Sequence, residues 1–494
     1  MDYSVLKSGT DIRGVASDIL GNKVNLTAEA ISAISKAFVV WYVNKYKKSS
    51  SELVIAVGHD SRITGEEISK KVISTLSLSG VKVLDCGLSS TPAMFMTTVD
   101  LKTDASIEIT ASHHPSDRNG LKFFLPSGGL DSKDIAEIVE IANNGEEVIA
   151  EIEGDIVKTA YMEQYAARLR KMICNAVGKT EDEKPLGDYK IVVDAGNGVG
   201  GFYAKNVLEK LGADISGSRF LEPDGMFPNH IPNPENEKAM ASICEAVVSS
   251  NADLGIIFDT DVDRAGCVGS DGRQINRNRL IALASYIATK GRKGAVVVTD
   301  SVTSDGLKKF IEEDLGCVHY RYRRGYKNVI NKAVELTEEG KDCPIAIETS
   351  GHAALKENYF LDDGAYLVTK IVIELAKGKN INAIIENLEL PAEEIEIRLE
   401  IMEEDFKSYG ETVINEFEKF IKSRAEYKIC EDNREGIRVS TKNGWFLLRL
   451  SVHDPVMPMN FESNIVGGIK DEAQKLLEFF SKFEKLNIDC LKNI

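Results

Sequence analysis

Three carboxylates at alternate positions form the first feature that could do chemistry. The segment 259–264, DTDVDR, places them directly after the apolar run 254–258. Side chains at this spacing can converge on one hard cation, and a site with only oxygen ligands suits Mg²⁺, which leaves room for a phosphoryl oxygen. A calcium-binding EF-hand would need glycine at the sixth place and glutamate at the twelfth, where this chain has Arg264 and Ser270. A solvated acidic turn is the remaining alternative, and three carboxylates in register favour the magnesium site over it.

A serine, two histidines and a lysine form the second feature, in the segment 105–126. The runs ASIEIT and LKFFL are typical of strands, and Asn119-Gly120 predicts a turn just before the second run. Ser112 would then lie near the top of the connecting loop. Lys122, at the start of the returning strand, can point toward that serine. A solvent-exposed hairpin tip is the alternative, and the cluster Ser-His-His beside a lysine favours a functional loop.

Two further segments carry polar groups that suit a sugar phosphate. Segment 348–352, ETSGH, follows a strand-like run with a carboxylate, hydroxyls, a glycine and an imidazole, which can hydrogen-bond sugar hydroxyls. Segment 449–455, RLSVHDP, clusters an arginine, a serine and a histidine in the way that a phosphate oxyanion requires. Either of these two segments alone is weak evidence for a sugar-phosphate site. The evidence becomes strong only because all four segments described so far point to the same chemistry.

A glycine-rich segment offers a competing interpretation. Residues 196–201 follow a strand-like run and match the G-x-G-x-x-G pattern of dinucleotide-binding folds, with Glu222 about twenty residues further on. Asp194 stands directly before the glycines, where it would face the pyrophosphate and repel it. A tight strand-to-helix turn is therefore the preferred interpretation.

Strands and helices must position these segments. A helix is predicted after the capping residue Thr27, because the apolar side chains that follow fall on one face at helical spacing and would be core residues: Ile31, Ile34, Phe38 and Trp41. Buried-strand patterns, each followed by a polar loop and a helix-like stretch, occur at 53–57, 190–194, 254–258 and 295–299. Such repeated units predict α/β domains with largely parallel sheets, which bind ligands at the carboxyl ends of their strands.

The C-terminal part has a different pattern. Segment 437–451 is typical of a β-hairpin with Asn443-Gly444 at its turn, which predicts a smaller α+β domain. Changes in composition along the chain predict the domain boundaries. The resulting division is into residues 1–155, 156–272, 273–385 and 386–494.

Composition and charge limit the classes of partner. The 494 residues are 43% hydrophobic and 28% charged, which is ordinary for a globular protein. The 60 Lys and Arg residues against 77 Asp and Glu residues give a net charge of −17, which disfavours nucleic acid, although a local basic pocket can still bind a small anion. The eight cysteines are scattered singly, as expected for reduced thiols in a cytoplasmic protein. With no signal-peptide pattern and no membrane-length apolar run, we expect no membrane partner.

The order and content of these segments resemble the α-D-phosphohexomutase superfamily of phosphoglucomutases and phosphomannomutases, over essentially the whole chain. Together the segments are highly specific, because chance agreement in this order is negligible. The similar segments are SGTDIRG (8–14), TASHHP (110–115), EPDGMFPNHIPNPE (222–235), DTDVDR (259–264), ETSGH (348–352) and RLSVHDP (449–455).

The resemblance implies both a fold and a chemistry. Four domains would surround a central cleft: three related α/β sheet domains and a smaller C-terminal α+β domain, each contributing one loop. Ser112 would carry a phosphoryl group, an oxygen of which would join Asp259, Asp261 and Asp263 in holding Mg²⁺. The catalytic residues would be Ser112, Arg13, His113, Lys122 and His352. Of these, Lys122 or His352 would be the general base, and His113 would orient the phosphate.

The resemblance also implies an isomerase that interconverts hexose 1-phosphate and hexose 6-phosphate through a hexose 1,6-bisphosphate, which is intermediate and activator. Glucose and mannose phosphates would be the substrates. The substrate-binding residues would be Arg264, Lys327, Glu348, Ser350, Gly351 and His352, and the phosphate-binding residues would be Arg449, Ser451 and His453. The usual R-x-S-G-T-E-P of the phosphate loop is altered here at Val452, His453 and Asp454, and Ile347 stands where the sugar loop usually begins with glycine.

Three alternatives stay open beside this activity. A phosphoglucosamine mutase is the nearest one, and Thr349 does not decide against it. A non-catalytic sugar-phosphate sensor would typically have lost the serine or one of the aspartates, all of which are present. A phosphatase would arise if water intercepted the phosphoserine. The sequence leaves the oligomeric state open.

Overall fold

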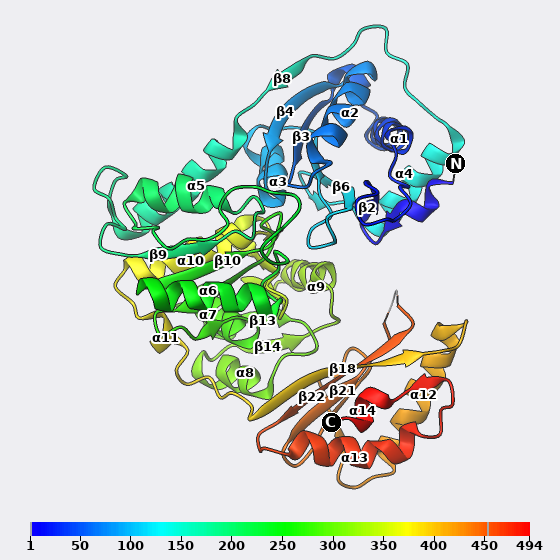
Figure 1. Ribbon diagram of the computed structural model, residues 1–494, viewed down its shortest axis with the longest axis vertical. Helices are drawn as coiled ribbons and strands as arrows, with labels where there is room; N and C mark the ends of the chain where they lie inside the picture. Colours follow the sequence, from blue (N-terminus) through cyan, green and yellow to red (C-terminus); the bar gives the residue numbers. More distant parts are fainter. Residues whose placement is uncertain (1, 452–453) are drawn as a thin grey trace. The chain divides into compact units, whose positions relative to one another are not determined.

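The computed structural model describes residues 2–451 and 454–494, and the chain forms two compact units. The first unit holds residues 1–276, 350–353 and 361–382, and the second holds residues 277–349, 354–360 and 383–494. Each unit contains two sheets. Their order along the chain can be followed by the colours of Figure 1, which run from blue at the N-terminus to red at the C-terminus.

The first sheet of the first unit has eight strands and carries the N-terminal third of the chain. Its strand order is β1-β2-β6-β5-β3-β4-β8, and β7 pairs with β6. The central pairs β5–β3, β3–β4 and β4–β8 are parallel, whereas β6 runs antiparallel to both β5 and β2. The strands are β1 (Lys7–Ser8), β2 (Asp11–Val15), β3 (Val54–His59), β4 (Lys82–Leu88), β5 (Ala105–Ile109), β6 (Arg118–Leu125), β7 (Gly128–Gly129) and β8 (Ile156–Lys158).

Helices cover both faces of this sheet (Figure 1). The helices α1 (Ala28–Tyr46), α2 (Gly65–Leu78) and α4 (Ser132–Asn144) share one core with the strands, and α3 (Thr91–Asp100) packs against β3, β5 and β6. The short 3₁₀ turns are η1 (Tyr3–Leu6) and η2 (Ser50–Glu52).

The helix predicted after Thr27 is confirmed as α1. The Thr27 hydroxyl accepts a hydrogen bond from the Ala30 N–H at 3.3 Å, and this bond satisfies one of the donors left open at a helix start. The four predicted apolar side chains are buried in the core. Among them, the Trp41 indole N–H donates to Glu137 at 2.9 Å, so burying this ring leaves no polar atom unsatisfied.

The second sheet of the first unit has the strand order β12-β11-β10-β9. Strands β9 and β10 are parallel, and β10 and β11 form an antiparallel hairpin. The strands are β9 (Ile191–Asp194), β10 (Leu254–Phe258), β11 (Ala265–Gly269) and β12 (Gln274–Ile275). Its helices are α5 (Tyr161–Val177), η3 (Tyr203–Leu208), η4 (Glu209–Leu211), α6 (Glu237–Ser250) and α10 (Gly364–Ala376), and β17 (Leu361–Asp362) leads into α10.

The second unit begins with a sheet in which β13 lies between β14 and β15, parallel to both. The strands are β13 (Val296–Thr299), β14 (Val318–Arg321), β15 (Ile345–Ile347) and β16 (Ala353–Leu355). The helices around it are α7 (Asn278–Thr289), α8 (Asp305–Lys309), η5 (Phe310–Asp314), α9 (Tyr326–Glu338) and η6 (Lys356–Asn358), and the short α11 (Ile381–Ile384) follows α10.

The fourth sheet has six antiparallel strands in the order β19-β20-β21-β22-β18-β23. Two long helices, α12 and α13, share one core with its strands. The elements are β18 (Glu393–Ile401), α12 (Phe406–Lys422), β19 (Lys428–Ile429), β20 (Ile437–Ser440), β21 (Gly444–Leu448), β22 (Val456–Ser463), α13 (Gly468–Phe480), β23 (Leu486–Asn487) and α14 (Asp489–Lys492).

The predicted fold class is confirmed: three α/β sheet domains are followed by an α+β sheet domain. The predicted C-terminal hairpin is β20–β21, although Gly444 is already the first residue of β21. The turn predicted at Asn119-Gly120 is wrong, because both residues lie inside β6 and Gly120 pairs with Arg13 of β2. A Cβ at residue 120 would lie 2.2 Å from the Ile12 carbonyl oxygen, so this glycine serves close strand pairing instead of a turn.

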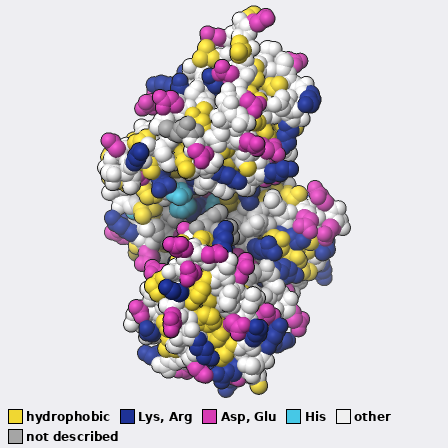
Figure 2. All heavy atoms as spheres, turned by 90° about the vertical axis from the view of Figure 1, so that its right-hand side faces the viewer, with side chains coloured by type: hydrophobic (Ala, Val, Ile, Leu, Met, Phe, Trp, Pro, Cys, Tyr) yellow, Lys and Arg dark blue, Asp and Glu magenta, His cyan; other side chains and the backbone are white. Residues whose placement is uncertain are grey.

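The surface carries charged side chains of both signs, and the cysteines are unpaired, as the composition and the cysteine spacing predict. On the face drawn in Figure 2, Lys and Arg side chains alternate with Asp and Glu side chains. All eight cysteines are free thiols, and five of them are buried. Within the described residues, every helix is too short or too polar to cross a bilayer. The domain boundaries stay a prediction.

Candidate active site

The three predicted metal aspartates lie in the loop that joins β10 to β11. The strands pair up to Phe258 and Ala265, so the loop between them is short and the carboxylates are brought together. Val262 adopts a left-handed conformation with φ of 67°, which turns the chain within the loop. One carboxylate oxygen from each of Asp259, Asp261 and Asp263 lies within 4.8 Å of the others, and all three residues are buried. The predicted convergence of the three carboxylates is therefore present.

The charges around this triad fit a divalent cation. Lys122 Nζ lies 2.8 Å from Asp263 and 3.6 Å from Asp261, and Arg264 Nε lies 3.0 Å from Asp259. Two cationic side chains thus face three buried carboxylates, which leaves a negative charge that is costly in the interior. The Oδ1 atoms of Asp261 and Asp263 are buried without a hydrogen-bond partner among the described residues. Burial, followed by the charge of Asp263, raises the pKa of Asp259 well above its ordinary value. A bound Mg²⁺ would supply both the missing charge and the missing partner.

A threonine at the start of α3 ties the first sheet to the metal loop. The Thr91 hydroxyl donates to the Asp261 carboxylate at 2.5 Å, and the Thr91 N–H donates to the Asp261 carbonyl at 3.0 Å. Together with Lys122, which is on β6, this contact aligns the loop of the second sheet with the first sheet. The metal loop is therefore held by α3 and by β6, and β6 is also the strand that follows the serine loop.

Ser112 lies in the loop that follows β5, in a strained conformation. Its φ is 52°, a value that non-glycine residues rarely adopt and that often marks a functional position. The Ser112 N–H donates to the Thr110 hydroxyl at 2.8 Å, and that hydroxyl donates to Asp60 at 2.7 Å. Burial raises the pKa of Asp60 to about 6, although the neighbouring Arg62 opposes this shift. The strained serine is thus fixed by a chain of buried hydrogen bonds.

Arg62 is the main support of the serine loop, and sequence reasoning did not single it out. Its guanidinium is buried and lies 3.3 Å from Asp60. It donates to the carbonyl oxygens of three loop residues and of the first residue of β6: Ser112, His114 at 2.7 Å, Pro115 at 2.7 Å and Arg118 at 2.9 Å. A planar group with five donors suits this task, which no lysine could copy. The only signal in the sequence was its place in a polar loop directly after a buried strand.

We expect Arg62→Lys to lower mutase activity by about 10- to 100-fold and the free energy of unfolding by about 2–4 kcal/mol. Lysine keeps the charge beside Asp60 but leaves several loop carbonyls without a donor. Steady-state kinetics and urea unfolding would measure the two effects. Arg118→Lys, which changes a half-buried arginine at the start of β6, directly after this loop, is the matched control. Wild-type activity in Arg62→Lys would contradict the supporting role.

His113 is placed to contact the serine side chain. Its Nδ1 lies 3.2 Å from Ser112 Oγ. Partial burial, followed by the charge of Arg264, lowers the pKa of His113, although part of the ring is exposed. A lowered pKa favours the neutral imidazole, which suits a group that orients the serine and not one that donates a proton.

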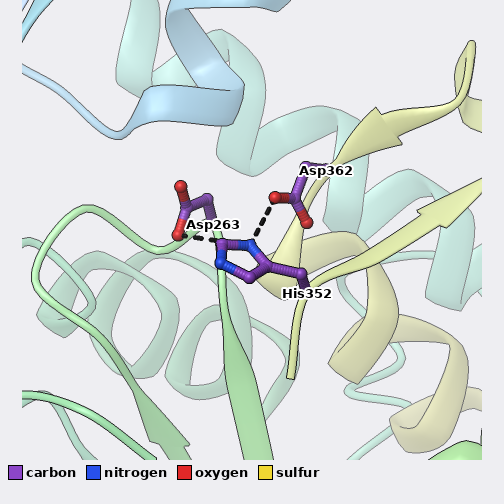
Figure 3. A group of neighbouring side chains, drawn as sticks. All are labelled: Asp263, His352 and Asp362. Atoms are coloured by element: carbon purple, nitrogen blue, oxygen red, sulfur yellow. Dashed lines mark hydrogen bonds and ion pairs between the residues drawn. The ribbon is translucent and has the colours of Figure 1, made fainter. Parts of the chain in front are cut away.

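His352 forms a hydrogen-bonded group with Asp362, which sequence reasoning missed (Figure 3). Its Nδ1 lies 2.5 Å from the Asp362 carboxylate and 3.9 Å from Asp263. The backbone of His352 forms a β-bridge with Arg264, next to the metal loop. Burial would lower the pKa of His352, but the carboxylates of Asp362 and Asp263 outweigh it and raise the pKa. These three side chains could also hold a metal ion, but a set that includes imidazole suits zinc better than Mg²⁺.

The remaining predicted residues of the first unit are Arg13, Ser350 and Gly351. Arg13 donates to Asp11 at 2.8 Å and to the Ala111 carbonyl at 3.4 Å, beside the serine. Ser350 is buried. Gly351 has a φ of 96°, and a Cβ there would lie 2.8 Å from the Ala265 carbonyl oxygen, so the tight approach of this loop to β11 requires glycine.

The second unit holds the other predicted residues. Glu348 accepts a hydrogen bond from the Gly325 N–H at 2.6 Å, and Lys327 is in the first turn of α9. Arg449 lies 3.4 Å from Glu396. The Ser451 N–H donates to the Val456 carbonyl at 3.0 Å. His453 lies outside the described residues.

The glycine-rich segment has a structural role. Asp194 accepts hydrogen bonds from the His230 ring at 3.0 Å and from the Ser242 hydroxyl at 2.7 Å, so its carboxylate is engaged inside the second sheet domain. A Cβ at Gly201 would lie 2.0 Å from the Leu221 carbonyl oxygen. The glycine is therefore explained by close packing of the chain on itself, as the strand-to-helix interpretation predicts.

Comparison with known proteins places this geometry in a family. Models of the phosphoglucomutase/phosphomannomutase α/β/α domains I, II and III match residues 7–148, 161–272 and 276–390. A phosphomannomutase/phosphoglucomutase of Pseudomonas syringae is 30% identical over 457 residues, which cover 92% of this chain and 90% of that protein. A phosphoglucomutase of Neisseria meningitidis is 28% identical over 463 residues, 93% of each chain.

Solved structures show the same fold. A phosphoglucomutase/phosphomannomutase family protein from Burkholderia thailandensis has a TM-score of 0.78 at 24% identity and covers 98% of both chains. The sequence matches extend over almost the whole chain, and the buried carboxylate triad could hold a metal ion. The chain therefore belongs to the phosphoglucomutase/phosphomannomutase family of α-D-phosphohexomutases and is a phosphohexomutase, an isomerase that moves a phosphoryl group within a hexose phosphate.

Proposed function

We propose that this mutase acts on glucose and mannose phosphates through a phosphoserine at Ser112, with a hexose 1,6-bisphosphate as intermediate and activator. The observation that carries the proposal is a strained, buried serine in the loop between β5 and β6, together with a triad of buried carboxylates that Thr91 and Lys122 contact. The oxygen-only triad, with its two unpartnered Oδ1 atoms, is the part that fits Mg²⁺. When bound, the ion would neutralise charge on the phosphoserine and its neighbours.

The first half-reaction transfers the phosphoryl group to the sugar. The bond between Ser112 Oγ and phosphorus breaks, and a bond forms between phosphorus and a sugar hydroxyl oxygen. Such transfers depend mainly on positioning and charge neutralisation. Lys122 and Arg264 supply positive charge at the metal loop, and Arg13 supplies it beside Ala111 of the serine loop. Arg62 holds the loop carbonyls so that Oγ keeps its direction.

We propose that His352, rather than Lys122, is the general base that takes the proton of the attacking hydroxyl. The ammonium of Lys122 is hydrogen-bonded to Asp263. Asp362 accepts from Nδ1 of His352, an arrangement that orients the other ring nitrogen and strengthens it as a base. The departing Ser112 Oγ takes up a proton from water. In the second half-reaction Oγ gives that proton back to water as it attacks phosphorus, and the His352 imidazolium protonates the sugar oxygen that leaves.

The second half-reaction requires the bisphosphate to turn over, so that its other phosphoryl group passes to Ser112. The phosphate far from the serine then binds Arg449, Ser451 and His453 in each half-reaction. The sugar between them binds Glu348 and Ser350 through its 3- and 4-hydroxyls, which stay usable in both orientations. These contacts do not distinguish the configuration at carbon 2, and this is the reason for expecting both glucose and mannose phosphates.

The substrate assignment is tested by comparing sugars under identical conditions. The purified protein, with Mg²⁺ and a trace of hexose 1,6-bisphosphate, is assayed on glucose 1-phosphate, mannose 1-phosphate and glucosamine 1-phosphate. We expect kcat/KM for the first two to agree within about tenfold, and that for glucosamine 1-phosphate to be lower, because a cationic amino group meets Arg264 and Lys122. A preference for glucosamine 1-phosphate would establish the phosphoglucosamine mutase alternative. Release of inorganic phosphate as the main product would establish the phosphatase.

A further inference from the structure

A carboxylate in the second unit lies between two arginines that come from distant parts of the chain. Glu396, on β18, accepts a hydrogen bond from Arg324 at 3.1 Å and from Arg449 at 3.4 Å, both through the same oxygen, Oε2. Asn460 of the neighbouring strand β22 donates to that oxygen at 3.1 Å. One carboxylate oxygen is thus surrounded by three donors, in the way that an oxygen of a bound phosphate would be.

Arg449 has unused capacity for an anion. Its side chain is largely buried, with 11% exposed, and its Nε has no hydrogen-bond partner among the described residues. Burial and the nearby charge of Arg324 lower its pKa, although the carboxylates of Glu435, Glu396 and Asp300 oppose this shift. Two neighbouring cations and an unpartnered donor favour the binding of an anion with more charge and more oxygens than one carboxylate has.

Glu396 also has another partner that could hold it if it left this place. Its second oxygen, Oε1, lies 3.3 Å from both Nε and Nη2 of Arg398, a mostly exposed arginine on the same strand. Turning toward Arg398 would keep the carboxylate paired while freeing the space between Arg324 and Arg449. The Glu396 carboxylate is therefore held between Arg324 and Arg449, but it could leave this position and stay paired with Arg398.

We propose that Glu396 is an internal competitor for the substrate phosphate, and that it sets the affinity of the phosphate subsite by occupying the oxyanion position between Arg324 and Arg449. The inference rests on the proposed role of Arg449 in phosphate binding. A phosphate dianion displaces the carboxylate because it brings a second charge and can engage Arg449 through two nitrogens. A singly charged anion does not gain enough over the resident carboxylate. Glu396 thereby makes the subsite selective for dianions.

The test is the affinity for inorganic phosphate, measured by calorimetry on the full-length protein with Mg²⁺ present. Glu396→Gln keeps the size of the side chain and an oxygen for Asn460 but removes the charge. We expect phosphate to bind about fivefold or more tightly in Glu396→Gln than in the wild type, with a smaller preference for phosphate over formate. Glu400→Gln, which changes an exposed carboxylate on the same strand, should bind phosphate like the wild type.

A second variant shows where the phosphate binds. Adding Arg449→Gln to Glu396→Gln should abolish the gain in affinity, and thermal unfolding checks that each variant is folded. Equal or weaker phosphate binding in Glu396→Gln would overturn the proposal, and so would a gain that persists without Arg449. Failure of the proposed function would show differently, as absence of mutase turnover in the wild-type preparation.

Discussion

Replacing Ser112 by alanine is expected to lower mutase turnover by at least about 10⁴-fold, because the group that receives and returns the phosphoryl is removed. The fold should survive, since Arg62 binds the backbone of this loop and the Ser112 N–H still has its bond to Thr110. Intact-protein mass spectrometry should show a species one phosphate heavier in the wild type and none in Ser112→Ala.

Ser116→Ala is the matched control for this variant, because Ser116 lies four residues further along the same loop and is partly buried. It should keep both the phosphorylated species and wild-type turnover to within about twofold. A phosphate that maps to another serine, or turnover that persists in Ser112→Ala, would contradict the assignment.

The second large effect is expected from Asp261→Asn. Asparagine keeps an oxygen for the Thr91 hydroxyl but removes one of the three charges that would hold Mg²⁺. We expect turnover to fall by about 10²–10³-fold, with little recovery at excess Mg²⁺. The thermal unfolding temperature should rise with Mg²⁺ in the wild type, because an ion that binds only the folded chain stabilises it. That rise should be much smaller in Asp261→Asn.

Without Mg²⁺ the same variant should be at least as stable as the wild type. It relieves the repulsion among three buried carboxylates that Lys122 and Arg264 offset in part. Asp271→Asn, in the turn after β11, changes a carboxylate outside the triad and is the control for a general loss of charge. An equal Mg²⁺-dependent shift in Asp261→Asn and the wild type would show that the ion binds elsewhere.

The sequence was most informative where one local pattern decides the outcome. The side chains of α1 repeat at helical spacing after a capping threonine, and the strand runs are short, apolar and followed by polar loops, so these elements could be predicted. The three aspartates could also be predicted as a group, because alternate positions after a strand converge without help from the rest of the chain.

Contacts between distant segments could not be predicted in this way. Asn119-Gly120 has the composition of a turn, but pairing with β2 extends the strand through it, so tertiary pairing overrides the local preference. Arg62 and Asp362 matter through partners about 50 and 10 residues away, which are brought near only by the sheets. Glu396 is one of many glutamates in the sequence, and only the approach of Arg324 and Arg449 distinguishes it.

The central claim is that the phosphoryl group on Ser112 is the one transferred to the sugar. Enzyme carrying a radioactive phosphoryl group is mixed with unlabelled glucose 1-phosphate in a rapid-quench apparatus. The account predicts that label leaves the protein for hexose 1,6-bisphosphate at a rate no slower than kcat, and that it later appears in glucose 6-phosphate. Label that stays on the protein during turnover, or leaves only as inorganic phosphate, would contradict the account.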